Sequence, residues 1–268
     1  MIIIGEKING TIPAVGAAIA TKDRDFITDL ALRQSESGAD YIDICASTTP
    51  EQEVEALKWL IDAVQAVTNT PISIDSPDPL VIREVFGYIK RPGLINSVSL
   101  EGEKTTVLFP MIADTEWQCV VMLCDDSGIP SEVESRLRIA KKMVDLATTH
   151  GITPDRLHVD PLVMALPTDG ASMAKFMSCC REIKALYPDI HITSGLSNIS
   201  YGLPARKSLN QSFLILAMSA GMDSAIMNPL DRDMVAAVLS TEALLGKDRH
   251  CRNFTNAYRE GRIGRPKE

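Results

Sequence analysis

The sequence predicts a (β/α)8 barrel of the α/β class, and three observations support this prediction. Short apolar segments of strand length alternate with longer amphipathic segments along the whole chain, which indicates parallel strands joined by helical crossovers. There are eight segments of each kind. The length of 268 residues is also the size at which eight such units close into a single barrel.

The expected strands are runs of apolar and β-branched residues that are bounded by polar residues or glycine. They cover Ile2–Ile4, Tyr41–Cys45, Ile72–Asp75, Leu94–Ser97, Cys119–Cys124, Leu157–Asp160, Ile190–Ser194 and Ser224–Met227. The main rival is an open doubly wound sheet, which usually carries a glycine-rich phosphate turn after its first strand. Here the segment Gly5–Gly10 does not match that pattern, so the closed barrel is favoured.

The expected helices lie between these strands and show apolar residues at helical spacing. The second of them opens at Thr49-Pro50-Glu51, where proline suits a first helical turn. The predicted ranges are Asp23–Glu36, Glu51–Val67, Pro79–Tyr88, Glu103–Ala113, Ser131–Thr149, Ser172–Leu186, Ser208–Ala220 and Arg232–Leu245. We therefore expect one barrel domain over residues 1–256, followed by a loose polar extension over residues 257–268.

Composition excludes several classes of protein. A net charge of −8 without a marked lysine-arginine run argues against a nucleic-acid partner. No apolar stretch approaches the ~20 residues that span a bilayer, and the apolar start Met1–Gly5 is too short for a signal peptide. The six cysteines and four histidines have no metal-ligand spacing, so we expect no metal site and reduced thiols in a cytoplasmic protein.

Carboxylates and amides stand at or just after the expected strand ends, where barrel enzymes place their chemistry. They are Glu6, Asn9, Asp43, Asp75, Asn96, Asp125, Asp160, Asn198 and Asn228. Basic residues are scarce there, with Lys7 in the first loop and Arg206 near the seventh. Such an acceptor-rich pocket suits a neutral ring with many N–H donors, such as a pterin, with Asp accepting from ring nitrogens and Asn donating to a carbonyl.

Each of these residues also has a purely structural interpretation. Asp75 could cap the next helix, and Asp160 could belong to a plain turn before Pro161. Several polar residues at matching positions favour a binding site over these separate roles. Asp43 is expected to be structural, while Asp125 and Asp126 are expected in a solvated turn with Gly128.

Five segments together resemble the pterin-binding methyltransferases that move a methyl group between tetrahydrofolate and a corrinoid. They are Ile3-Ile4-Gly5-Glu6-Lys7-Ile8-Asn9-Gly10, Ile74-Asp75-Ser76, Ile95-Asn96-Ser97, Val159-Asp160-Pro161-Leu162 and Gly195-Leu196-Ser197-Asn198. The resemblance is strongest to the stand-alone methyltetrahydrofolate:corrinoid protein methyltransferases. It is more distant to the pterin domains of cobalamin-dependent methionine synthase and dihydropteroate synthase.

The resemblance implies a homodimeric enzyme that binds tetrahydrofolate or 5-methyltetrahydrofolate and docks a corrinoid (cobalamin) protein, with methyl transfer in either direction. Asp75, Asn96 and Asp160 would hold the pterin ring, and Asn198 would lie near N5. Asn198 and Asp75 are thus the expected catalytic residues. By the same resemblance, the site would also be lined by Gly195, Ser197 and Arg206.

The chain departs from the family pattern at Cys45, where relatives often carry Asn, at Ser47, where they carry Gly, and at Tyr201-Gly202, where a polar pair is common. Two other functions stay open at this point. One is a dihydropteroate synthase-like enzyme, which needs a cationic site for pyrophosphate. The other is a non-catalytic folate-binding subunit.

Overall fold

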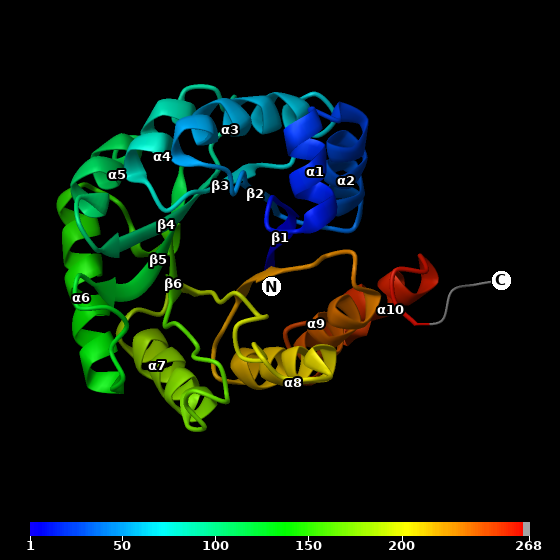
Figure 1. Ribbon diagram of the computed structural model, residues 1–268. Helices are drawn as coiled ribbons and strands as arrows, with labels where there is room; N and C mark the ends of the chain where they lie inside the picture. The colour runs from blue at the N-terminus through cyan, green and yellow to red at the C-terminus, as the bar shows by residue number, and fades with distance from the viewer. Residues whose placement is uncertain (265–268) are drawn as a thin grey trace.

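Eight parallel strands form a nearly closed barrel with helices on its outside, as the sequence predicts (Figure 1). The computed structural model describes residues 1–264. The strand order is β7-β6-β5-β4-β3-β2-β1-β8, so sequence neighbours pair and β1 pairs with β8. The strands are β1 (Ile2–Asn9), β2 (Tyr41–Cys45), β3 (Ile72–Asp75), β4 (Leu94–Leu100), β5 (Gln118–Asp125), β6 (Leu157–Asp160), β7 (His191–Ile192) and β8 (Ser224–Met227).

Several of the helices begin with recognisable signals. Proline occupies the first turn of α1, α3 and α4, and the Asp231 side chain caps α9 by accepting hydrogen bonds from the N–H groups of Asp233 and Met234. In the described chain the α-helices are α1 (Pro13–Thr21), α2 (Arg24–Glu36), α3 (Pro50–Gln65), α4 (Pro79–Phe86), α5 (Lys104–Ile112), α6 (Val133–Thr149), α7 (Ser172–Leu186), α8 (Arg206–Ser219), α9 (Arg232–Leu244) and α10 (Arg252–Arg259).

The apolar core has two parts. The larger part lies between the strands and the surrounding helices and includes Leu57, Phe109 and Phe176, all fully buried. The smaller part is a separate cluster of Ile4, Leu94 and Val120, contributed by β1, β4 and β5. Successive side chains of a strand point to opposite faces, so each of these strands contributes residues to both parts of the core. The packed interior leaves the ends of the barrel as the places for polar groups.

The barrel closes between β7 and β8, and this seam is its weakest strand pairing. β7 has only two residues, whereas the sequence predicts a strand over Ile190–Ser194. Beyond β7 the contact continues through single backbone hydrogen bonds, from Ile226 N–H to the Ser194 carbonyl (3.0 Å) and from Leu196 N–H to the Ile226 carbonyl (3.3 Å). The loop that follows Ser194 is therefore attached directly to the seam.

Two regions differ from the sequence prediction. β1 continues to Asn9, so Glu6 and Lys7 lie in the strand itself and not in a loop after it. The helices α1 and α10 were not predicted, because both are short and each is a second helix beside one that the strand–helix alternation already accounts for, α1 before α2 and α10 after α9.

The C-terminal region also differs from the loose extension that the sequence predicts. The expected boundary at residue 256 falls inside α10, and Ala257 and Ile263 are buried against Val235 of α9. Apolar contacts thus hold this segment on the barrel as far as Gly264. Residues 265–268, the rest of the expected extension, lie outside the described residues. Within residues 1–264, no helix has the length and apolar character needed to cross a membrane.

Candidate functional site

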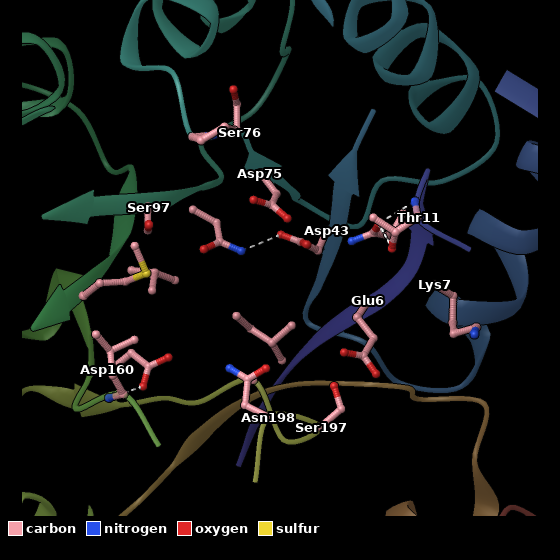
Figure 2. Close-up of a pocket in the computed structure, with 18 of the residues that line it drawn as sticks. Glu6, Lys7, Thr11, Asp43, Asp75, Ser76, Ser97, Asp160, Ser197 and Asn198 are labelled. Carbon is pink, nitrogen blue, oxygen red and sulfur yellow. Dashed lines mark hydrogen bonds between the residues drawn. The ribbon is translucent and has the colours of Figure 1, made fainter. Parts of the chain in front are cut away.

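A polar cavity of about 620 Å³ opens at the C-terminal ends of the strands (Figure 2). This is the face on which (β/α)8 barrels carry their active sites. The cavity is lined by all seven residues that the sequence predicts for the site, namely Asp75, Asn96, Asp160, Gly195, Ser197, Asn198 and Arg206. The structure thus brings together side chains that are up to 131 positions apart in the chain, since Asp75 and Arg206 lie on β3 and α8.

Strand register explains why three of these residues converge. Asp75 is the last residue of β3 and pairs directly with Asn96 of β4. Asp160 ends β6 in register with Met122 of β5, whose side chain also lines the cavity. Parallel strands end at the same edge, so equivalent positions on neighbouring strands face one site.

Asp43 belongs to the cavity, contrary to the expectation that it would be only structural. It is 3% exposed and lines the cavity wall from β2. Its Oδ1 accepts hydrogen bonds from Ser73 Oγ (2.5 Å) and from Asn96 Nδ2 (3.2 Å, Figure 2). The second bond fixes the orientation of the Asn96 amide, leaving its Oδ1 and second N–H for other partners.

Four carboxyl groups of the cavity have pKa values well above the ordinary range, and burial is the main cause for each. Burial raises the pKa of Asp160 to about 7, and the pKa values of Asp75 and Glu6 to about 6. Burial and the nearby charge of Asp75 raise the pKa of Asp43 well above its usual value. Groups that titrate near neutral pH are suited to hold or release protons during a reaction.

Asp160 sits among hydrogen-bond donors of the chain's own backbone. Its Oδ1 accepts a hydrogen bond from the Leu162 N–H at 2.8 Å. The Gly195 N–H and the charge of Arg136 also favour its ionised form, although burial outweighs them. The side chain is 6% exposed, so a ligand in the cavity meets a largely desolvated carboxyl group.

The loop from Gly195 to Asn198 lines the cavity on the side across from Asp75 (Figure 2). Asn198 is exposed, and within residues 1–264 its side-chain amide has no hydrogen-bond partner. Arg206 steadies the loop from the start of α8, because its Nη2 donates to the Ser197 carbonyl at 2.8 Å and its Nε donates to Ser200 Oγ at 3.1 Å. Because Arg206 holds the backbone at Ser197 and the Asn198 side-chain amide has no partner among the described residues, this amide is available to form a hydrogen bond with a ligand.

The cationic side chains of the cavity are more numerous than the sequence predicts. Lys7 and Arg206 line the cavity as expected, and Lys104 joins them from the first turn of α5. Lys104 was missed because it stands four residues beyond the end of β4, not at a strand end. Its Nζ is paired with Glu101 at 3.0 Å, so part of its charge is already neutralised.

Other strand-end residues lie outside this cavity. Asp125 accepts hydrogen bonds from Ser127 and closes a turn with Gly128, which confirms the predicted turn. Asn228 accepts a hydrogen bond from the Leu230 N–H beside the cavity, not within it. Cys45 contacts Ser47 at 3.1 Å, and burial raises its pKa to about 12, so it remains a neutral thiol. Within residues 1–264 no group of three or more His, Cys, Asp or Glu side chains is arranged to hold a metal ion.

The fold and the cavity define a (β/α)8 barrel with an acceptor-rich ligand site at its mouth. The chain belongs to the pterin binding enzymes, whose family model matches residues 8–228. It is 54% identical, over 98% of both chains, to the methylcorrinoid:tetrahydrofolate methyltransferase of Eubacterium limosum. It is 27% identical to the methionine synthase of Mycobacterium leprae, over 85% of this chain and 20% of that longer protein.

Solved structures of dihydropteroate synthases share the fold. The enzyme from Xanthomonas albilineans in complex with 7,8-dihydropteroate superposes with a TM-score of 0.65 at 20% identity, over 92% of this chain and 93% of that one. The enzyme from Yersinia pestis superposes with a TM-score of 0.68 at 16% identity, over 91% and 94% of the two chains. At this level of identity the likeness concerns the barrel and not the reaction.

Proposed function

We propose that this protein transfers a methyl group between N5 of tetrahydrofolate and the cobalt of a corrinoid that a partner protein carries. The observation that carries the proposal is the cavity, in which Asp75, Asn96 and Asp160 lie together with the unpartnered amide of Asn198. The similarity to a methylcorrinoid:tetrahydrofolate methyltransferase over nearly the full length of both chains supports it.

In this proposal the protein binds the edge of the pterin ring that carries its N–H and NH2 donors. These donors form hydrogen bonds with the carboxyl groups of Asp75 and Asp160. Asn96 accepts or donates a further hydrogen bond with the groups that its contact to Asp43 leaves available. Charge-assisted bonds of this kind are stronger than neutral ones, and burial of Asp160 shields them from water. The cavity volume of about 620 Å³ lies in the range of small-molecule sites.

We assign the chemical step to Asn198, with Asp75 as the second catalytic residue. The charge on N5 changes during transfer, and only an interaction that strengthens with this charge accelerates the step. The Asn198 amide offers either its oxygen or its nitrogen, so it serves transfer in both directions. Asp75, with its pKa raised to about 6, takes or supplies the N5 proton through water.

The corrinoid supplies or accepts the methyl group and is brought to the barrel mouth by its own protein. This chain's contribution is therefore to bind and orient the folate, to control the N5 proton and to leave one side of the cavity open for docking. A homodimer remains a prediction from the family resemblance, and a cytoplasmic location remains a prediction from the sequence. Analytical ultracentrifugation of the purified protein tests the dimer directly.

A spectroscopic assay tests the proposed function. Methylcobalamin, tetrahydrofolate and the protein are incubated without oxygen, and we expect the visible spectrum of methylcobalamin to decay while 5-methyltetrahydrofolate appears on chromatography. The Asn198→Ala variant, prepared identically, is the control for contaminating activity. Tetrahydrofolate binding without methyl exchange would identify a folate-binding subunit instead.

The same preparation tests the second pterin reaction. Lys7, Lys104 and Arg206 at the cavity give some basis for an anionic substrate, which a dihydropteroate synthase requires. However, Lys104 is paired with Glu101, and Arg206 is bonded to the Ser197 carbonyl. We therefore expect no dihydropteroate from a dihydropterin pyrophosphate and 4-aminobenzoate.

A further inference from the structure

Arg136 is a fully buried arginine that lies outside the cavity. It stands in the first turn of α6, is 1% exposed, and is among the largest completely buried side chains of the protein. Arginine is rarely buried to this extent unless its guanidinium group has partners, because the loss of hydration is costly. The identity of these partners therefore indicates what the residue is for.

The partners are backbone carbonyl groups of two loops. One Nη atom donates to the carbonyl oxygens of Pro161 (3.0 Å) and Leu162 (2.8 Å), and Nε donates to the Pro130 carbonyl at 2.9 Å. Pro161 and Leu162 directly follow Asp160 at the end of β6. The guanidinium fork thus ties the start of α6 to the turn that leaves the strand.

That turn is strained and also holds the Asp160 side chain. Leu162 has a φ of +63°, a left-handed conformation that is unfavourable for a residue other than glycine because its Cβ crowds the backbone. The same residue donates its N–H to Asp160 Oδ1 at 2.8 Å. A strained turn of this kind persists only where its surroundings enforce it, and the two carbonyl contacts of Arg136 are such an enforcement.

We propose that Arg136 is a positioning residue for Asp160, which it orients towards the cavity through the Pro161–Leu162 turn. It touches no substrate and acts through backbone atoms and its nearby charge. The inference rests on the proposed function, because it concerns the carboxyl group assigned there to the pterin. The proposal predicts that Arg136, a residue of α6 outside the cavity, affects the affinity for folate and not only the stability of the fold.

The first test replaces the fork but keeps the charge. Arg136→Lys has one nitrogen in place of the fork, so it cannot reproduce the contacts to both loops. We expect the KM for tetrahydrofolate, with methylcobalamin as methyl donor, to rise about tenfold while kcat changes less than twofold. A residue that only stabilises the fold would instead lower kcat by reducing the active fraction, with KM unchanged. Arg138→Lys, at an exposed position of the same helix, is the matched control and should leave both constants unchanged.

A double-mutant cycle then identifies the residue through which Arg136 acts. Tetrahydrofolate affinity is measured by calorimetry for the native protein, Arg136→Lys, Asp160→Ala and the double variant. We expect the tenfold effect of Arg136→Lys to vanish in the Asp160→Ala background, because no carboxyl group remains to be oriented. Additive effects would overturn the inference. Arg136→Gln, which keeps N–H donors without charge, is run in parallel, and loss of the native fold in both Arg136 variants would also overturn it.

The cycle separates this inference from the proposed function. If the native protein does not bind tetrahydrofolate, the proposed function fails, and the inference fails with it. If the native protein binds tetrahydrofolate and transfers methyl groups but shows no coupling between Arg136 and Asp160, only the positioning role is lost.

Discussion

The two ends of the barrel treat polar groups in opposite ways. At the N-terminal end, His158 is fully buried and both ring nitrogens are satisfied, by Gln118 Oε1 at 2.6 Å and by Ser224 Oγ at 2.9 Å. Burial lowers the pKa of His158 to about 3, so the ring is neutral at neutral pH. Since Gln118 Oε1 only accepts, the proton is on Nε2, and Ser224 donates to Nδ1. At the C-terminal end, the amide of Asn198 faces the cavity without such partners in the described chain.

The carboxyl groups show the same contrast. Asp223, near the N-terminal end, accepts hydrogen bonds from Lys184 (2.8 Å) and the Ile192 N–H (2.8 Å). Burial would raise its pKa, but these partners and His191 together lower the pKa to about 2. At the other end, burial outweighs the available donors and raises the pKa of Asp160 to about 7. At the N-terminal end hydrogen-bond partners outweigh burial for Asp223, whereas at the cavity burial outweighs the partners of Asp160.

The largest effect that distinguishes the two ends is expected from Asn198→Ala. Loss of an amide that acts on the developing charge at N5 should lower turnover about a hundredfold, as for other single donors of this kind. Tetrahydrofolate affinity should change less than threefold, and the melting temperature should not fall, because the amide has no internal partner. Steady-state kinetics, calorimetry and thermal melts measure the three quantities. Undiminished turnover would contradict the assigned role.

The converse experiment is made at the N-terminal end of the barrel. His158→Leu leaves the partners of His158 on Gln118 and Ser224 unsatisfied in the interior, so we expect the free energy of unfolding to drop by about 3 kcal/mol. Turnover per folded molecule should remain within twofold of the native value. Urea denaturation combined with active-site titration checks both statements. A specific loss of turnover would show that the two ends are not separable.

Asp160→Asn removes a carboxyl group from the cavity while it keeps the size of the side chain. Loss of a charge-assisted hydrogen bond should weaken tetrahydrofolate binding by about 1–3 kcal/mol, which calorimetry measures. Unlike His158→Leu, this variant should be at least as stable as the native protein at pH 8, because it removes a buried negative charge. Unchanged affinity would count against Asp160 as a pterin ligand.

The smallest expected effect is a pH dependence of stability with opposite signs at the two ends. The pKa of His158 is lowered from 6.5 to about 3, so its contribution is present above pH 6.5 and declines as the pH falls towards 3. The pKa of Asp160 is raised from 3.8 to about 7, so its contribution is present below pH 3.8 and is lost as the pH rises through 7.

Between pH 5 and 7 the two residues therefore oppose each other. The destabilisation caused by His158→Leu should be smaller at pH 5 than at pH 7. The change in unfolding free energy caused by Asp160→Asn should be more favourable at pH 8 than at pH 5. Chemical denaturation at these pH values measures the sign of each change. For one proton, the unfolding free energy changes by at most ~1.4 kcal/mol per pH unit.

The barrel could be predicted from the sequence because its strands carry strong local signals. Apolar runs ending in Asp75, Asp160 or Met227 have the right composition and length, and the observed strands coincide with them. β7 was overestimated because Thr193 and Ser194 look like strand residues, yet they keep only single backbone hydrogen bonds, from Thr193 N–H to the Val159 carbonyl and from Ile226 N–H to the Ser194 carbonyl. α10 was missed because its stability comes from packing of Ala257 against Val235, a long-range contact that no local pattern reveals.

The same distinction applies to the site. Asp75, Asn96 and Asp160 could be placed in one cavity because each ends or lies within a strand, and barrel geometry does the rest. Asp43 was assigned to the wrong environment because its direction depends on the pleat of β2, which the sequence did not settle. Lys104 enters the cavity from α5, so its position depends on how that helix packs and not on a strand end.

The short seam between β7 and β8 has a consequence for motion. Amide hydrogens exchange with solvent through local opening, and segments held by few backbone hydrogen bonds open most easily. The Gly195–Asn198 loop is attached to this seam, whereas Asp75 and Asn96 lie on strands paired on both sides. Amides of residues 194–198 should therefore exchange faster than those of β3 and β4. We therefore expect the wall built by β3 and β4 to be the more rigid one. We expect the wall that bears Asn198, although Arg206 holds its Ser197 carbonyl, to be the one that moves when a ligand binds.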